Sequence, residues 1–359
     1  CWTIPPCLRM DITHLFVKNV RRGLVITAGF TKKRNYRKGQ NGSMKGMQLA
    51  KQYYETYGKP MLYEKFPALL PHIAVGLVGE GSECFGFDDD VSHDHDFGPD
   101  FCIFLPDETQ IDRRTAFELE RAYAKLPRTF EGFSRPWMNP VGGARRGVCR
   151  ADAFYQQTVG NAHGITKLTD WFFIPDHALA TATNGEVFFD GDGAFSAIRK
   201  GLLNMPTDVR KKKLAGTLLL MGQAGQYNYP RCLSHHDPAA AQLAITEFVR
   251  QALRACFLLS NRHMPYYKWQ FRALQECADF AFLSDTFSFL ISSDNDEVFV
   301  KTKTELVADT INNLLQHIRN KGWSTLTCNE AEQHAYAIND SIENENIRAL
   351  HILYGAQEM

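Results

Sequence analysis

The chain has 359 residues, enough for two folded domains, and its 44% apolar and 22% charged residues are those of a globular protein. No apolar run is long enough to cross a bilayer, so the composition excludes a membrane-spanning protein and we expect no membrane partner. The nine cysteines are odd in number and lack CxxC spacing, which argues against a disulfide framework and predicts a cytoplasmic protein.

The net charge of zero hides a basic beginning. Residues 1–43 hold nine Lys/Arg and one acid, Asp11, and show neither helical nor strand periodicity. A basic segment is typical of a nucleic-acid contact, but this one starts at Cys1 instead of Met. We therefore predict that residues 1–43 are an N-terminal extension, either unstructured or an artefact of an early start. Nucleic acid is expected as a partner only if this extension binds it.

A regular pattern begins at Met44. Apolar and aromatic positions predict a helix that ends at Gly58, ahead of a Lys-Pro pair. The next predicted elements are strands over 73–78 and 101–105, a helix over 115–125, a long loop over 127–146 and a strand over 146–152.

The segment between the first two strands carries the candidate chemistry. The strand over 73–78 leads into a turn that contains Gly81 and Ser82, whose backbone N–H groups and hydroxyl suit a phosphate. Twelve residues after Ser82 stand Asp94 and Asp96. Residues two apart in an extended segment point the same way, so these aspartates present two carboxylates on one face. Hard oxygen ligands at that spacing suit Mg²⁺.

The second half of the sequence reads as almost wholly helical. The predicted helices are one through residues 214–225, one that Asp237 and Pro238 start and that runs to Leu259, one over 267–283, and one from Thr302 to Gly322. The fold class is therefore α+β: a domain over 44–176 that contains a mixed β-sheet with flanking helices, followed by an all-helical C-terminal bundle over 177–359.

Several strings resemble one bacterial family of nucleotidyltransferase-like proteins whose cellular role is unassigned. They are GLVGEGSECFG and DHDFGP around the turn and the aspartates, NGEVFFD at 184–190, QAGQYNYPR at 223–231 and PYYKW at 265–269. The turn, the spacer and Asp-x-Asp together are similar to the signature of the nucleotidyltransferase superfamily. The helical half is also distantly similar to that of aminoglycoside nucleotidyltransferases.

This resemblance implies an enzyme that moves a nucleoside monophosphate from a nucleoside triphosphate, with ATP as the expected donor, to a hydroxyl of a small-molecule acceptor. Two Mg²⁺ ions would be held by Asp94 and Asp96, and Gly81 and Ser82 would bind the triphosphate. A third carboxylate usually completes such a site. The candidate is Asp152, although this residue is read equally well as a helix N-cap.

Residues of the helical half complete the expected site. Lys268 is the candidate for neutralising the outer phosphates, and its alternative is a surface lysine whose stem covers aromatic area. Tyr227, Asn228 and Arg231 are candidates for the acceptor pocket, and their alternative is a polar face between helices.

Two other functions stay open. The fold could bind a nucleotide as a sensor or scaffold without transferring anything. The alternation of His93 and His95 with the aspartates also suits a transition metal in a hydrolase, although Phe97 stands where a common metallo-hydrolase pattern has Asp.

Overall fold

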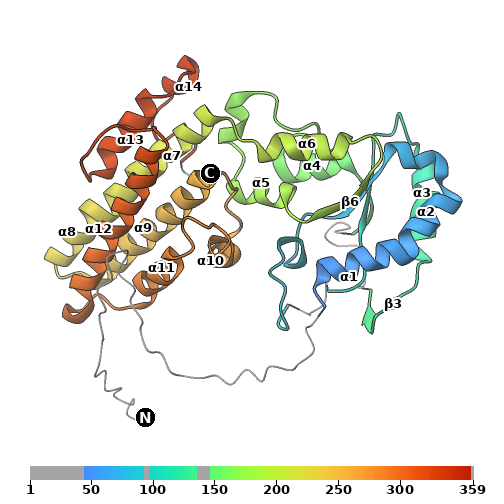
Figure 1. Ribbon diagram of the computed structural model, residues 1–359, viewed down its shortest axis with the longest axis horizontal. Coiled ribbons are helices and arrows are strands. Elements are labelled where there is room, and N and C mark those ends of the chain that lie inside the picture. Colours follow the sequence, from blue (N-terminus) through green and yellow to red (C-terminus); the bar gives the residue numbers. More distant parts are fainter. Residues whose placement is uncertain (1–43, 93–96, 136–145, 357–359) are drawn as a thin grey trace, which may run out of the picture. The chain divides into compact units, whose positions relative to one another are not determined.

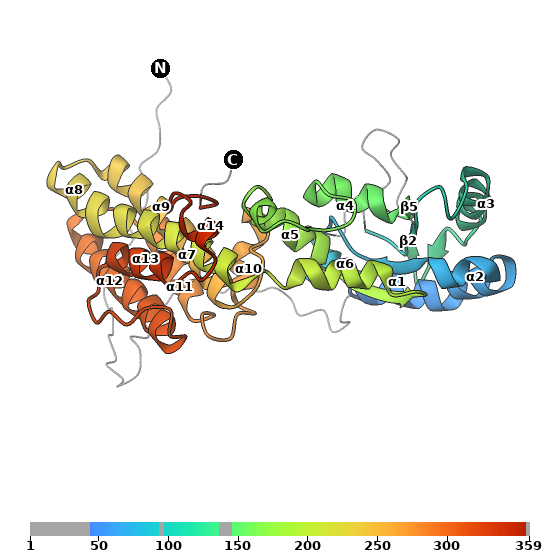
Figure 2. The same cartoon turned by 90° about the horizontal axis from the view of Figure 1, so that it is seen from above.

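The structure is a computed structural model that describes residues 44–92, 97–135 and 146–356 (Figures 1 and 2). Its centre is a four-stranded mixed sheet in the order β5-β2-β1-β6. Strand β1 is antiparallel to both of its neighbours, whereas β2 and β5 are parallel. The strands are β1 (Ala74–Leu77), β2 (Cys102–Leu105), β5 (Gly147–Arg150) and β6 (Glu186–Asp190). The two central strands are fully buried, as their continuous apolar sequences predict.

Each face of the sheet packs against aromatic side chains. On one face, Ile103 belongs to a core that also includes Tyr53 and Leu62 from the first helices of the chain. On the other face, Phe104 stacks on Phe195 with ring centroids 4.2 Å apart. Because successive side chains of a strand point to opposite faces, β2 stabilises both layers at once.

The helix that was predicted to end at Gly58 continues past it. Helix α1 (Gly46–Tyr53) passes through a π-helical segment, Tyr54–Gly58, into α2 (Lys59–Lys65). A Cβ atom at Gly58 would lie 2.4 Å from Cζ of Phe101, so this glycine permits close packing on the sheet and is not a C-cap. The predicted end is therefore wrong.

The sheet extends beyond residue 176, where the first domain was expected to end. Strand β6 pairs with β1 and comes from the part that was predicted to be all-helical. The other elements of this half are α3 (Arg113–Ala124), the short strands β3 (Thr129–Phe130) and β4 (Phe133–Ser134), α4 (Ala151–Val159), α5 (Asp176–Thr183), α6 (Ala194–Leu203), and 3-10 helices Pro67–His72, Glu83–Phe85 and Leu168–Phe172.

The remaining described residues form a bundle around α9 (Pro238–Leu259), which packs on several of its neighbours (Figure 1). Asp237 caps this helix, because its Oδ1 accepts a hydrogen bond from the N–H of Ala240 at 2.9 Å, as predicted. The other helices are α7 (Thr207–Gly222), the π-helix Gln223–Asn228, α8 (Tyr229–Ser234), the 3-10 helix Tyr267–Trp269, α10 (Gln270–Leu274), α11 (Leu283–Ser292), α12 (Glu297–Asn320), α13 (Ala331–Asp340) and α14 (Glu345–Arg348).

Two predicted helix boundaries in the bundle are wrong. The segment 267–283 is a 3-10 turn, the five-residue helix α10 and a further turn, instead of one long helix. Helix α12 begins at Glu297, because Asp296 accepts hydrogen bonds from the N–H groups of Val298 and Phe299 and caps it six residues before the predicted cap, Thr302. The α+β class is confirmed. None of the helices in the described ranges is long and apolar enough to span a membrane.

Candidate functional site

The strand order brings the two halves of the candidate motif to one edge of the sheet. Because β1 and β2 are antiparallel, with Gly76 opposite Cys102, the end of β1 lies beside the beginning of β2. The turn 79–82, called the glycine turn below, follows β1, and residues 97–101 lead into β2. Asp94 and Asp96, together with His93 and His95, lie outside the described residues.

The residues that flank the motif meet at Gly46. A Cβ atom at Gly46 would lie 2.6 Å from Cβ of Glu83 and 3.1 Å from Cε2 of Phe97. Glu83 directly follows Ser82, and Phe97 directly follows Asp96. The first residue after the glycine turn and the first residue after the acidic pair therefore lie against the same backbone.

The glycine turn has a backbone that suits glycine. Gly79 and Gly81 have φ angles of 101° and 119°, values that residues with a Cβ rarely adopt. Asn184, just before the neighbouring strand β6, holds the turn: its Oδ1 accepts from the N–H of Gly79 at 2.8 Å, and its Nδ2 donates to the carbonyl of Gly79 at 2.6 Å. Glycine at position 81 also leaves room for the Glu83 carboxylate, because a Cβ atom there would lie 2.5 Å from Oε1 of Glu83. The Ser82 hydroxyl donates to Oε2 of the same carboxylate at 3.5 Å.

A buried ion pair supports the turn from its other side. The guanidinium of Arg146 pairs with the carboxylate of Glu83 and donates to the carbonyl of Glu80 at 3.1 Å. Burial raises the pKa of the neighbouring Cys84 thiol to about 12. This thiol is therefore protonated at neutral pH and is not a nucleophile.

Asp100, immediately before β2, is a buried carboxylate that the sequence did not single out. Its Oδ1 accepts from Nη2 of Arg135 at 3.3 Å and from the N–H of Phe101 at 3.1 Å. Burial raises the pKa of Asp100, and the guanidinium groups of Arg135 and Arg146 oppose that rise. This pair fixes the entry into β2, where the chain arrives from the acidic motif.

Asp152 is not on a strand. Strand β5 ends at Arg150, and Asp152 lies in the first turn of α4, where its Oδ1 accepts from the N–H of Ala153 at 2.6 Å. It is not the N-cap either, because Arg150 occupies that position. Since β5 is parallel to β2, its carboxyl end lies at the edge of the sheet opposite to the end of β1. The strand position expected for a third catalytic carboxylate is therefore wrong. Among the described residues, no group of three or more His, Cys, Asp or Glu is arranged to hold a metal ion.

Lys268 is exposed and lies in the 3-10 turn Tyr267–Trp269. Its Nζ lies 4.9 Å from the centroid of the Trp269 ring. Trp269 in turn contacts Phe87, with ring centroids 5.8 Å apart. The segment that carries Lys268 therefore lies against the segment that follows the glycine turn, although Lys268 does not begin a long helix as was expected.

The three acceptor-pocket candidates lie elsewhere in the bundle. Tyr227 and Asn228 are in the π-helix before α8, and Arg231 is in α8. Nη1 of Arg231 donates to the Tyr227 hydroxyl at 2.8 Å. Both views place α8 at the end of the bundle away from the sheet, which is marked by β6 in Figure 1 and by β2 and β5 in Figure 2. The structure does not bring these residues to the glycine turn.

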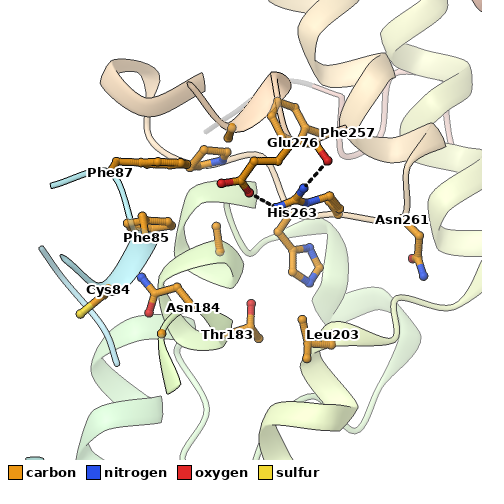
Figure 3. Close-up of a pocket in the computed structure, with 15 residues that line it drawn as sticks. Cys84, Phe85, Phe87, Thr183, Asn184, Leu203, Phe257, Asn261, His263 and Glu276 are labelled. Carbon is orange, nitrogen blue, oxygen red and sulfur yellow. Dashed lines mark hydrogen bonds and ion pairs between the residues drawn. The ribbon is translucent and has the colours of Figure 1, made fainter. Parts of the chain in front are cut away.

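A cavity of about 270 Å³ lies between the segment after the glycine turn and the bundle (Figure 3). Figure 3 shows Phe85 and Phe87 on one side, with His263 and Glu276 across from them. The lining residues are Cys84, Phe85, Phe87, Ala180, Thr183, Asn184, Gly185, Leu203, Phe257, Asn261, Arg262, His263, Pro265, Ala273 and Glu276. Asn184 therefore contacts both the cavity and the glycine turn.

Arg199 of α6 lies behind the wall of this cavity. Its Nη2 donates to the carbonyl of Gly185 at 2.9 Å, whereas its Nη1 is buried and has no hydrogen-bond partner in the described part of the chain. Burial lowers the pKa of Arg199 from its high ordinary value. Asn184 and Arg199 stand more than 100 residues after the glycine turn, so no local pattern indicated their place beside it.

Comparisons with known proteins find a family model and a solved structure to which this chain is similar. A family model described as "Domain of unknown function (DUF4037)" matches residues 171–270. Among solved structures, the chain is similar to a nucleotidyltransferase-like protein from Exiguobacterium sibiricum 255-15. The TM-score is 0.33 and the identity 11%, over 82% of this chain and 81% of that chain. No match was found among curated proteins. The segment 171–270 includes Asn184, Arg199 and much of the cavity wall.

Replacement of Asn184 by Ala is expected to loosen the glycine turn. Both hydrogen bonds to Gly79 are lost, which should lower the free energy of unfolding by about 1–3 kcal/mol. Urea denaturation measures this change. Asn204→Ala is the matched control, because Asn204 is exposed and its amide donates to a carbonyl within its own helix. Equal losses in the two variants would contradict a special role for Asn184.

Proposed function

We propose that the protein is a Mg²⁺-dependent nucleotidyltransferase that moves a nucleoside monophosphate from a nucleoside triphosphate, most simply ATP, to a hydroxyl of a small-molecule acceptor. The supporting observation is the meeting of Glu83 and Phe97 at Gly46. It places the flanks of the glycine turn and of the acidic pair side by side, as a phosphate-binding turn and its metal ligands require.

Asp94 and Asp96 fit the metal by the chemistry of their donor set. Two carboxylates separated by one residue offer hard oxygen ligands, and no softer sulfur ligand belongs to the motif. Mg²⁺ bound there would neutralise charge on the phosphates and stabilise the attacking and leaving oxygens.

In this proposal the glycine turn and Asn184 bind and orient the triphosphate. A phosphate bound at Gly81 displaces the Glu83 carboxylate, which lies against this glycine and accepts from the Ser82 hydroxyl. Once Glu83 has moved, Gly81 lets the phosphate approach the backbone closely and the Ser82 hydroxyl donates to it. Asn184 fixes the turn in that conformation through Gly79. The acceptor hydroxyl loses its proton and its oxygen bonds to the α-phosphorus, while the bond from that phosphorus to the β-phosphate oxygen breaks and pyrophosphate leaves with the bonding electrons.

The test is incubation of the purified protein with Mg²⁺ and each of four labelled triphosphates, with cell extract as the source of acceptors. Release of pyrophosphate together with a labelled product supports the proposal. Tight triphosphate binding without transfer would instead favour a nucleotide-binding sensor. Stoichiometric zinc or iron in the protein as purified would favour the hydrolase.

Lys268→Ala is expected to weaken triphosphate binding about tenfold or more, because a hydrogen bond to a charged group contributes about 1.5–3 kcal/mol. Lys268→Arg should restore only part of the affinity, since its fork has a different geometry. The matched control is Lys321→Ala, because Nζ of Lys321 also lies over a tryptophan, Trp323, at 5.8 Å. Calorimetric titration measures each affinity. Unchanged binding by Lys268→Ala would make Lys268 a surface residue.

A further inference from the structure

The cavity beside the glycine turn has one wall built from parallel aromatic rings. The rings of Phe85 and Phe87 have centroids 5.9 Å apart and planes inclined by only 7°. Phe87 is buried and held by Trp269, whereas Phe85 is only partly buried. Phe257, Leu203 and Pro265 add apolar surface. A wall of this kind favours a flat ring, because aromatic faces stack on one another.

The charges around the cavity are paired or positive. Nη2 of Arg262 lies 2.6 Å from Oε2 of Glu276, and this ion pair lines the cavity (Figure 3). Arg199 lies behind the wall, against Gly185. The lining carboxylate of Glu276 is thus already engaged by a cation, and a second cation stands close by. A ligand with several positive charges would be repelled here.

The cavity lining also contains polar side chains that can form hydrogen bonds with the edge of a bound ring. The carboxamide of Asn184 uses one N–H and one oxygen lone pair on Gly79, which leaves it one more donor and one more acceptor site. Thr183 and Asn261 add polar groups to the lining. The remaining donor and acceptor lie on opposite sides of the planar carboxamide, so either one can make a single hydrogen bond to the polar edge of a ring.

We propose that this cavity binds an uncharged planar heteroaromatic ring, with a nucleobase-like edge, and not a polycationic acceptor of the aminoglycoside type. The inference deepens the proposed function, because the ring would belong either to the nucleoside of the triphosphate or to the acceptor. A ring from the triphosphate and a ring from the acceptor would make the same contacts with Phe85 and Asn184. Only a ring from the triphosphate would occupy the position that free adenosine takes, and so only then would adenosine and ATP compete.

Three probes test the cavity by calorimetric titration: adenosine, tripolyphosphate with Mg²⁺, and kanamycin as the polycation. Adenosine is expected to bind the wild-type protein and to bind about tenfold more weakly to Phe85→Ala, in which one stacking face is lost. Leu203→Trp should also weaken adenosine binding by filling part of the cavity, and it should fold because Leu203 is 43% exposed. The matched control is Phe117→Ala, since Phe117 is 57% exposed on α3 and does not line the cavity.

These titrations show whether the ring belongs to the triphosphate or to the acceptor. They also test the ring site separately from the proposed nucleotidyl transfer. Competition between adenosine and ATP assigns the ring to the triphosphate, and simultaneous binding assigns it to the acceptor. Tripolyphosphate binding should be unchanged in Phe85→Ala.

The inference is overturned if adenosine fails to bind, or if it binds equally to the wild type, Phe85→Ala and Leu203→Trp. This holds even where nucleotidyl transfer is detected. Kanamycin binding that Phe85→Ala or Leu203→Trp weakens also overturns it. Adenosine binding to the cavity with no transfer under any condition sinks the proposed function and leaves the ring site standing.

Discussion

Replacement of Asp94 by Asn is expected to reduce nucleotidyl transfer to background while the protein stays folded. The amide has nearly the same volume as the carboxylate but carries no charge, so the proposed metal loses a ligand. Without metal, two neighbouring carboxylates repel each other. The variant should therefore unfold at the same urea concentration as the wild type, or at a higher one, when EDTA is present. Asp96→Asn should behave in the same way.

The controls for this prediction distinguish the two kinds of metal enzyme. Asp90→Asn changes an exposed aspartate of the same segment and should retain transfer. His93→Ala and His95→Ala should also retain transfer, because Mg²⁺ prefers oxygen ligands. Full activity in Asp94→Asn would remove the basis of the two-metal proposal. Loss of a tightly held transition metal in either histidine variant would indicate a hydrolase.

Local sequence predicted the parts of the fold that depend on local physics. The apolar runs of β1 and β2 were recognisable because both strands are buried on both faces. Asp237 and Pro238 marked the start of α9 because capping involves only neighbouring residues. These elements place the glycine turn beside the entry to β2 once their antiparallel pairing is known.

The wrong predictions share a dependence on distant contacts. Gly58 resembles a helix C-cap in sequence, yet its role is to accommodate Phe101, which lies 43 residues later. The segment 267–283 has aromatic residues that a helix would accept, but Trp269 packs on Phe87 of the sheet half instead. Asp152 was read as part of a strand because α4 follows β5 with no intervening loop.

The candidate site also has residues that local sequence indicates and residues that only distant contacts bring into place. Gly81 and Ser82 are recognisable in sequence because glycine and serine have local backbone roles. Asn184 and Arg199 reach the turn and the cavity only through the pairing of β6 with β1. A single sequence gives no sign of that pairing, although NGEVFFD is one of the strings that resemble the nucleotidyltransferase-like family.

A buried cluster that joins the beginning of α5 to the bundle is expected to be highly sensitive to substitution in its effect on stability. Asp176 is 3% exposed, and its carboxylate pairs with Nζ of Lys213 at 2.9 Å and with Nε of Arg254 at 2.8 Å. Arg254 also donates to the carbonyls of Gly355 and Ala356. One carboxylate therefore holds α5, α7, α9 and the segment after α14 together.

Asp176→Asn should lower the free energy of unfolding by about 3–5 kcal/mol, because removal of one partner leaves buried charge uncompensated. Urea denaturation at neutral pH measures the loss. Glu55→Ala is the control: Glu55 forms an exposed pair with Lys59, and its removal should change stability by less than about 1 kcal/mol. If Lys213→Met is added to Asp176→Asn, part of the loss should be recovered, since one uncompensated cation is then removed.

The pH dependence of stability gives a second measure of the same cluster. Burial alone raises the pKa of Asp176, but Arg254 and Lys213 outweigh it and hold the pKa below its ordinary range. A carboxyl group whose pKa is lower in the folded state stabilises the protein above its unfolded pKa, about 3.9, and that stabilisation is lost as the pH falls further. The wild type should therefore lose stability below about pH 4 more steeply than Asp176→Asn. Parallel profiles would show that Asp176 is not the group responsible.

The position of this cluster also links stability to the proposed site. Helix α5 begins at Asp176 and ends at Thr183, and the next residue, Asn184, bonds to the glycine turn. An anchor at the first turn of α5 therefore fixes the residue that shapes the turn at its other end. We expect Asp176→Asn to weaken triphosphate binding under conditions in which the variant is still fully folded, whereas Glu55→Ala leaves binding unchanged. Equal triphosphate affinity in the folded Asp176→Asn variant would show that Asn184 is held by the sheet alone.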